Sequence, residues 1–155
     1  MEDGRCRASA SYDGGGAQIG VALEEALTNA LFHGNLEISS DLRQEDDRRF
    51  YELADRRRGV APYKHRRVEV RVRVNRRESI FTIKDEGPGF DTSCIDRPME
   101  AEDMLRVGGR GLLLIRAYMD DVRFNARGNQ ITMIKKNRLS VPDDGSGRAS
   151  ERPLS

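Results

Sequence analysis

Apolar positions recur along this chain with a helical period in some stretches and with a two-residue period in others. The helical period over residues 17–33 predicts an amphipathic helix, and Gly34 is a suitable stop signal after it. The apolar stripe of this helix consists of Leu23, Ala26, Leu27, Ala30 and Leu31. Residues 41–58 predict a second, highly charged helix, whose thin apolar stripe favours a position on the surface. That stripe comprises Leu42, Phe50, Leu53 and Ala54.

The two-residue period begins at Val68, where four valines alternate with charged side chains as far as Val74. This alternation predicts a half-buried strand with the valines facing inward. The later pattern predicts a turn, a strand, a helix and a hairpin, at residues 75–78, 79–84, 112–119 and 121–136 respectively. The hairpin has strands at 121–125 and 130–136, because the Gly and Asn between them favour a turn.

The composition limits the class of protein. A chain of 155 residues suits one domain, and 27 basic against 26 acidic side chains leave almost no net charge. We therefore expect no direct nucleic-acid or membrane partner, and no apolar run approaches the length of a membrane span. No secretory signal opens the chain, and Cys6 and Cys94 lack histidine partners at metal-ligand spacing. These features predict a cytoplasmic protein without a zinc site.

Glu25 and Asn29 lie four residues apart on the first predicted helix, so their side chains stack on one face. A carboxylate can polarise a hydroxyl or water, and an amide oxygen can bind Mg²⁺, a cation that prefers oxygen ligands. Such pairs are also common on solvated helix faces, so this pair alone indicates little.

Two glycine-containing stretches change that assessment. Asp85 follows a predicted strand and precedes Gly87 and Gly89, which let a ligand approach the backbone closely. Its carboxylate can accept a hydrogen bond from an exocyclic amine such as that of adenine. Residues 108–111 contain three glycines and open the third helix, where free N–H groups favour phosphate. Each glycine-containing turn alone could be an ordinary loop, but the occurrence of all three motifs in this order is much rarer than any one of them.

This order of motifs resembles the GHKL ATP-binding fold shared by gyrase and histidine kinases. Within that fold, Glu-Ala-Leu-Thr-Asn-Ala-x-x-His-Gly at residues 25–34 resembles the bacterial anti-sigma-factor serine kinases, and residues 109–122 support the same branch. The resemblance covers roughly residues 20–136 and implies ATP and Mg²⁺ as cofactors. It implies a two-layer α/β sandwich, a mixed and mostly antiparallel sheet with helices packed on one face, here with shortened N-terminal elements. The chain contains no P-loop motif.

By the same resemblance, Glu25 matches the family's general base, Asn29 its Mg²⁺ ligand and Asp85 the carboxylate that reads adenine. The other predicted cofactor-binding residues are Gly87 and Gly89 in the base pocket, Gly109 and Gly111 beneath the triphosphate with their neighbours Arg110 and Leu112, His33 at the pocket edge, and Thr132. Thr132 matches a position where the family often has a hydroxyl near adenine, and an ordinary strand threonine is an equal alternative.

The predicted domain spans residues 17–136, between a flexible N-terminus at 1–16 and a disordered tail at 137–155. Compared with the compact kinases, it contains a charged helical insertion at about 37–66 and an ATP lid at about 91–110. The insertion carries a basic cluster, Arg56–Arg58 with residues 64–67. A solvated face explains this cluster, and a docking surface for an acidic partner is the alternative.

The resemblance implies a protein serine/threonine kinase that phosphorylates a partner in a bacterial partner-switching pathway. The expected partner is a STAS-type antagonist, a sigma factor or both, and a homodimer is a further candidate. A nucleotide-switched binding module and an ATPase are the alternatives. A sensor histidine kinase is not indicated, because no dimerising helical hairpin with a phosphorylated histidine is present in the sequence.

Overall fold

The computed structural model describes residues 15–94 and 109–137. Nearly all of the predicted tail and of the predicted flexible N-terminus, and most of the predicted lid, lie outside these ranges. The described elements are α1 (Gly15–Thr28), the π-helix η1 (Asn29–Asn35), α2 (Ser40–Glu45), α3 (Asp47–Arg58), η2 (Tyr63–His65), β1 (Glu69–Val74), β2 (Glu78–Lys84), η3 (Thr92–Cys94), α5 (Gly109–Tyr118), β3 (Asp121–Phe124) and β4 (Gln130–Lys136).

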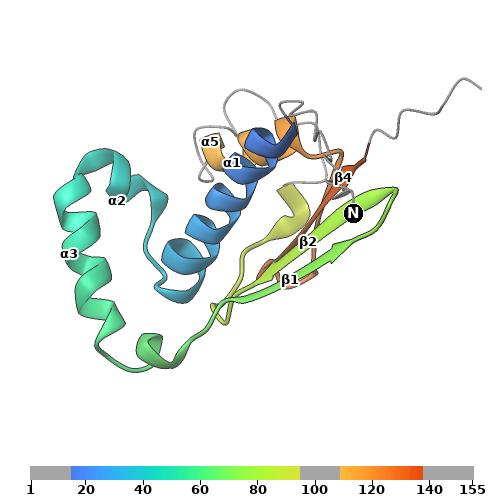
Figure 1. Ribbon diagram of the computed structural model, residues 1–155. Helices are drawn as coiled ribbons and strands as arrows, with labels where there is room; N and C mark the ends of the chain where they lie inside the picture. Colours follow the sequence, from blue (N-terminus) through green and yellow to red (C-terminus); the bar gives the residue numbers. More distant parts are fainter. Residues whose placement is uncertain (1–14, 95–108, 138–155) are drawn as a thin grey trace, which may run out of the picture.

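The four strands form one sheet in the order β1-β2-β4-β3, and all three pairings among them are antiparallel. Helices α1 and α5 lie side by side over one face of this sheet (Figure 1). The predicted two-layer α/β sandwich with helices on one face is therefore confirmed. The predicted strands and the third helix are also found, with bounds that differ by at most three residues.

The main core lies between the helices and β2 and β4. Alternate residues of the two central strands point into it, and Phe81 pairs with Met133 as Ile83 pairs with Ile131. Helix α1 contributes small side chains, Ala22, Ala26 and Ala30, whereas Leu27 and Leu31 are about 40% exposed. The prediction that both leucines belong to the buried stripe is wrong. Because these alanines form the stripe that packs closely against α5 and the sheet, the leucines that follow two of them lie to the side of the contact and are exposed.

The first helix does not end at Gly34. Its last α-helical residue is Thr28, and residues Asn29–Asn35 continue it as a π-helix whose C-cap is Leu36. The prediction of Gly34 as a stop signal is wrong, because the glycine serves a close tertiary contact instead. A π-helical turn is rare and often occurs at functional sites, so this change of helix type marks the region around Asn29.

Residues 36–66, here called the charged module, form two helices with a small core of their own. Helices α2 and α3 are separated at Asp46, whose extended backbone and side-chain bond to the Arg49 N–H cap α3. Phe50 and Ala54 are fully buried against Leu36 and Ile38. The prediction of one surface helix is therefore wrong, although Figure 1 shows that the module projects from the sandwich on one side.

Strand β1 is an edge strand, and its valines are exposed. Val70, Val72 and Val74 are 48%, 55% and 69% exposed, so the prediction of a half-buried strand is wrong for this strand. The register places Val70 and Val72 opposite the core residues Ile83 and Phe81, on the helix-covered face. The described helices leave that end of the face open, which the alternating pattern alone does not reveal.

Candidate functional site

A cavity of about 330 Å³ lies beside the end of α1, between the sheet and the start of the charged module. Five of the residues predicted from sequence line it, namely Asn29, His33, Asp85, Gly89 and Leu112. Its apolar walls come from β2, β3, β4 and α5, and residues 38–41 of the charged module contribute a further wall. The cavity thus lies where the predicted motifs meet.

Glycines bring the first and second motifs into contact. A Cβ atom on Gly34 would lie 2.6 and 2.7 Å from the two carboxylate oxygens of Asp85. A Cβ on Gly87 would overlap the carbonyl group of Gly34. Both positions therefore require the absence of a side chain, and the end of the long helix packs directly against the loop after β2.

The first and third motifs meet at Gly111. A Cβ on this residue would lie 2.5 Å from Oε2 of Glu25 and 3.7 Å from Nδ2 of Asn29. Glu25 and Asn29 therefore share one face, as predicted, and that face points to the start of α5. Gly109 is the first residue of α5, and Arg110 is exposed beside it. Arg110 does not line the cavity.

Asp85 is 9% exposed and is fixed through its main chain and its side chain. Its N–H donates to the carbonyl oxygen of Asn129 over 3.0 Å, and its Oδ1 accepts from the Gly87 N–H over 2.8 Å. Burial raises the pKa of the Asp85 carboxyl above its ordinary value, while the Gly87 hydrogen bond and the charges of Arg127 and Arg66 oppose this shift. The result is a fixed acceptor group at the wall of the cavity.

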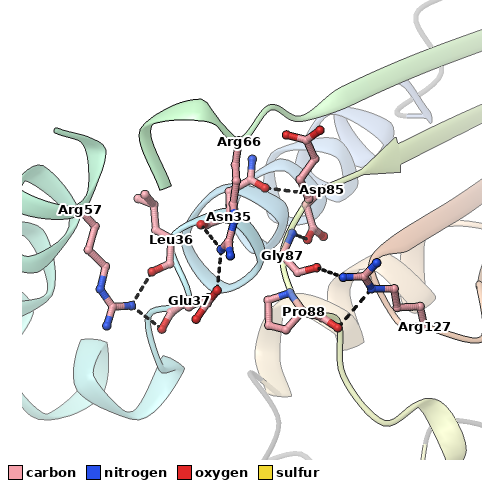
Figure 2. A network of polar contacts seen from close by, with 10 residues as sticks. Asn35, Leu36, Glu37, Arg57, Arg66, Asp85, Gly87, Pro88 and Arg127 are labelled. Carbon is pink, nitrogen blue, oxygen red and sulfur yellow. Dashed lines mark hydrogen bonds and ion pairs between the residues drawn. The ribbon is translucent and has the colours of Figure 1, made fainter. Parts of the chain in front are cut away.

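The turn between β3 and β4 holds the loop that follows Asp85. Arg127 donates to the carbonyl oxygens of Gly87 and Pro88 at 3.2 and 3.4 Å (Figure 2). Gly89 has a φ of +80°, and a Cβ there would overlap the Arg127 carbonyl oxygen. Gly89 therefore has both a conformational and a steric requirement for glycine.

Asn129 is a site residue that the sequence motifs missed. It is 5% exposed, lines the cavity, and donates from Nδ2 to the Asp85 carbonyl oxygen over 2.9 Å. Its Oδ1 accepts from Asn125 over 2.8 Å. The sequence indicates only a turn residue at this position after Gly128, because the contact of Asn129 with Asp85 depends on how β2 pairs with β4.

Thr132 does not lie near this cavity. It alternates with the core residues Ile131 and Met133 and pairs with Thr82 and Arg123, which places it on the opposite face of the sheet. The prediction that Thr132 contributes to the base pocket is therefore corrected, because strand alternation directs its side chain away.

His33 lines the cavity, and its ring forms a hydrogen bond within the protein. Its Nδ1 lies 2.6 Å from the carbonyl oxygen of Ile38, which orients the imidazole toward the charged module. The predicted position at the edge of the pocket agrees with this geometry. The hydrogen bond gives His33 a local structural role at the junction with residues 38–41.

The cavity and its rim can hold a flat apolar group with an amine donor at one end and an anion at the other. Asp85 supplies the acceptor, and the start of the ten-residue α5 offers N–H groups and the positive end of a helix dipole. Within residues 15–94 and 109–137, no group of three or more His, Cys, Asp or Glu side chains could hold a metal ion. The Asn29 amide oxygen suits Mg²⁺ chemically, but it would need oxygen ligands from a bound phosphate and water.

One comparison with known proteins gave a match. A family model described as a histidine kinase-like ATPase domain matches residues 5–135, which is most of the chain. No curated protein and no solved structure matched it. In addition, none of the helices in the described ranges is long and apolar enough to cross a membrane.

Proposed function

The chain belongs to the histidine kinase-like ATPase domain family, and from that premise we propose that it is an ATP- and Mg²⁺-dependent protein serine/threonine kinase. One observation carries this proposal. A single helix, α1 with its π-helical extension, contacts the Asp85 loop through Gly34 and the start of α5 at Gly111. The candidate base and metal ligand therefore lie on the helix that joins the two glycine loops, and Asn29 also lines the cavity.

At the base end, Asp85 accepts a hydrogen bond from the exocyclic amine of adenine. Its carboxylate is suited to this because the surrounding hydrogen bonds fix it before a ligand arrives. Ile83, Ile131 and Leu112 provide apolar walls for the purine. Gly87 and Gly89 allow the loop after Asp85 to pack closely against Gly34 and Arg127, which places that loop beside the cavity.

At the phosphate end, Glu25 takes the proton of the attacking serine or threonine hydroxyl of the partner. The hydroxyl oxygen then bonds to the γ-phosphorus as the bond to the β–γ bridging oxygen breaks, and ADP leaves. The N–H groups at the start of α5 stabilise charge on the transferred group. Asn29 would hold Mg²⁺, which offsets negative charge on the phosphates when it is bound.

The proposed substrate is a partner protein of the anti-sigma-factor type, either a STAS-type antagonist or a sigma factor, in a cytoplasmic partner-switching pathway. The motif at residues 25–34 supports this choice, because it resembles the anti-sigma-factor kinases at eight positions within a ten-residue stretch. The exposed basic side chains of the charged module (Arg56, Arg58 and Lys64) are suited to an acidic partner surface.

Incubation of the protein with labelled ATP and a STAS-type antagonist tests the proposal. We expect label on the antagonist, loss of that label in Glu25→Ala, and nearly unchanged ATP affinity in this variant. Glu24→Ala is the matched control, because it removes a neighbouring exposed glutamate that points away from Gly111. Equal labelling by Glu25→Ala would refute the proposed base.

Two other results would change the reaction class. Release of inorganic phosphate without labelling would favour an ATPase. ATP binding without either reaction would favour a nucleotide-switched binding module.

A further inference from the structure

We propose that Asn35 is a positioning residue for base recognition, because it fixes the peptide group that follows Asp85 and thereby the position of Asp85 at the cavity. This inference rests on the proposed function, in which Asp85 reads adenine. Asn35 does not line the cavity, and its role is exerted through the main chain of the loop after β2.

Asn35 connects the end of the long helix with the Asp85 loop. It is the last residue of η1 and is only 2% exposed. Its Oδ1 accepts a hydrogen bond from the Glu86 N–H over 2.8 Å. Figure 2 shows the side chain lying between the charged module and this loop. A buried amide with this contact is costly to replace by an apolar group.

The peptide group between Asp85 and Glu86 is therefore held at both ends. Its N–H, which belongs to Glu86, donates to Asn35, and its carbonyl oxygen, which belongs to Asp85, accepts from Asn129 over 2.9 Å. Two asparagines from different parts of the chain thus fix the plane of one peptide. Rotation of that plane would change the backbone angle ψ of Asp85 and shift Asp85 relative to the cavity.

Asn35 is itself fixed by the charged module. The Arg66 guanidinium donates to the Asn35 carbonyl oxygen over 2.9 Å and to Oε1 of Glu37 over 2.6 Å. The next residue, Arg67, donates its N–H to the Glu86 carboxylate over 2.7 Å. The segment that leaves the module therefore contacts both partners of the Asn35–Glu86 hydrogen bond.

Arg57 strengthens the same connection. Its guanidinium donates to the carbonyl oxygens of Leu36 and Glu37 at 2.5 and 2.7 Å, and it stacks on the Tyr63 ring. Two arginines thus satisfy three successive carbonyl groups, those of Asn35, Leu36 and Glu37, at the end of the π-helix, where a helix leaves acceptors without partners. The charged module therefore contributes to the geometry of the base end.

The test compares the affinities for ATP and for inosine triphosphate, which carries a carbonyl group in place of the amine. Asn35→Leu removes the acceptor at similar volume, and Asn35→Asp keeps an acceptor oxygen. We expect Asn35→Leu to lower the preference for ATP over inosine triphosphate about tenfold, as the loss of one well-placed hydrogen bond would. Asn35→Asp should keep that preference within about threefold of the wild-type value.

Asn75→Ala is the matched control. Asn75 also accepts backbone N–H bonds through Oδ1, from Arg77 and Glu78, but it lies in the β1–β2 turn. It should lower the melting temperature without changing the ratio of the two affinities. A merely structural role of Asn35 would behave in the same way and leave the ratio unchanged.

Arg66→Met supplies an independent variant if Asn35→Leu does not fold. It removes the donor to the Asn35 carbonyl oxygen from a partly exposed position and should lower the ATP preference about threefold. An unchanged ratio in the folded variants would overturn the role of Asn35 while leaving ATP binding intact. Wild-type protein that binds no ATP would overturn both this inference and the proposed function.

Discussion

The two ends of the cleft are built in different ways. At the base end, Asp85, Asn129 and Asn35 are buried and linked by hydrogen bonds between separate segments. At the phosphate end, Glu25 and Asn29 are only half-buried, and no hydrogen bond from their side chains is present within the part of the chain that the structure describes. The proposed base end is thus held by hydrogen bonds between separate segments, whereas within the described ranges none holds the side chains of Glu25 and Asn29 at the proposed phosphate end.

Substitution of a glycine by alanine should have different effects on stability and activity at the two ends. At Gly111 the added Cβ would meet the tip of the Glu25 side chain, which can move. Gly111→Ala should therefore preserve stability and displace Glu25, lowering the rate of phosphate transfer about 100-fold, as misplacement of a reactive group by about 1 Å can. Rates of partner labelling and a thermal melt measure both effects, and an unchanged rate would contradict the proposed role of this contact.

At the base end the obstacle is backbone, which cannot move locally. Gly87→Ala should lower the free energy of unfolding by about 1–3 kcal/mol, because its Cβ would overlap the Gly34 carbonyl group. Gly20→Ala is the control, since a Cβ there meets nothing within 4 Å and should stabilise helix α1 by up to about 1 kcal/mol. Denaturant titrations compare the two variants. Equal stability of both would show that the close approach of Gly34 is not required.

Removal of the charge at the base end should affect affinity more than chemistry. Asp85→Asn should weaken ATP binding about tenfold, because a charge-assisted hydrogen bond is roughly twice as strong as a neutral one. Binding of inosine triphosphate should change less. Calorimetry with both nucleotides measures this, and an equal loss for the two would mean that Asp85 does not read the exocyclic amine.

The raised pKa of Asp85 predicts a smaller, pH-dependent effect. Because burial favours the protonated carboxyl in the folded protein, stability from this group is present at low pH and is lost as the pH rises through the raised pKa. ATP affinity changes in the opposite direction, since the acceptor is the ionised form. On acidification, affinity should begin to fall at a higher pH than an ordinary aspartate would give. Fluorescence titrations over a pH series should show this fall in the wild type and not in Asp85→Asn.

The sequence predicted the elements better than their surroundings. Periodicity identified β1, but it could not show that β1 lies at an edge, so the predicted burial of Val72 was wrong. Gly34 had the features of a helix stop, yet tertiary packing against Asp85 determines its role. Local sequence patterns predict where helices and strands occur, whereas tertiary contacts determine which of their side chains are buried.

The site shows the same division. Glu25, Asn29 and Asp85 could be proposed as candidates because their motifs have fixed spacing along the chain. Asn35 and Asn129 carry no such motif, and their contacts with the Asp85–Glu86 peptide exist only when the η1 end and the β4 start reach the same loop. Residues whose contacts depend on the tertiary fold were therefore missed, and Thr132, which was matched to a position near adenine, lies on the opposite face of the sheet.

Isothermal titration of the wild-type protein with ATP in the presence of Mg²⁺ tests the central claim most directly. If the separated motifs form one nucleotide cleft, the titration will show heat with one site per chain, and ATP will raise the melting temperature. No heat and no thermal stabilisation by millimolar ATP or ADP would contradict the claim.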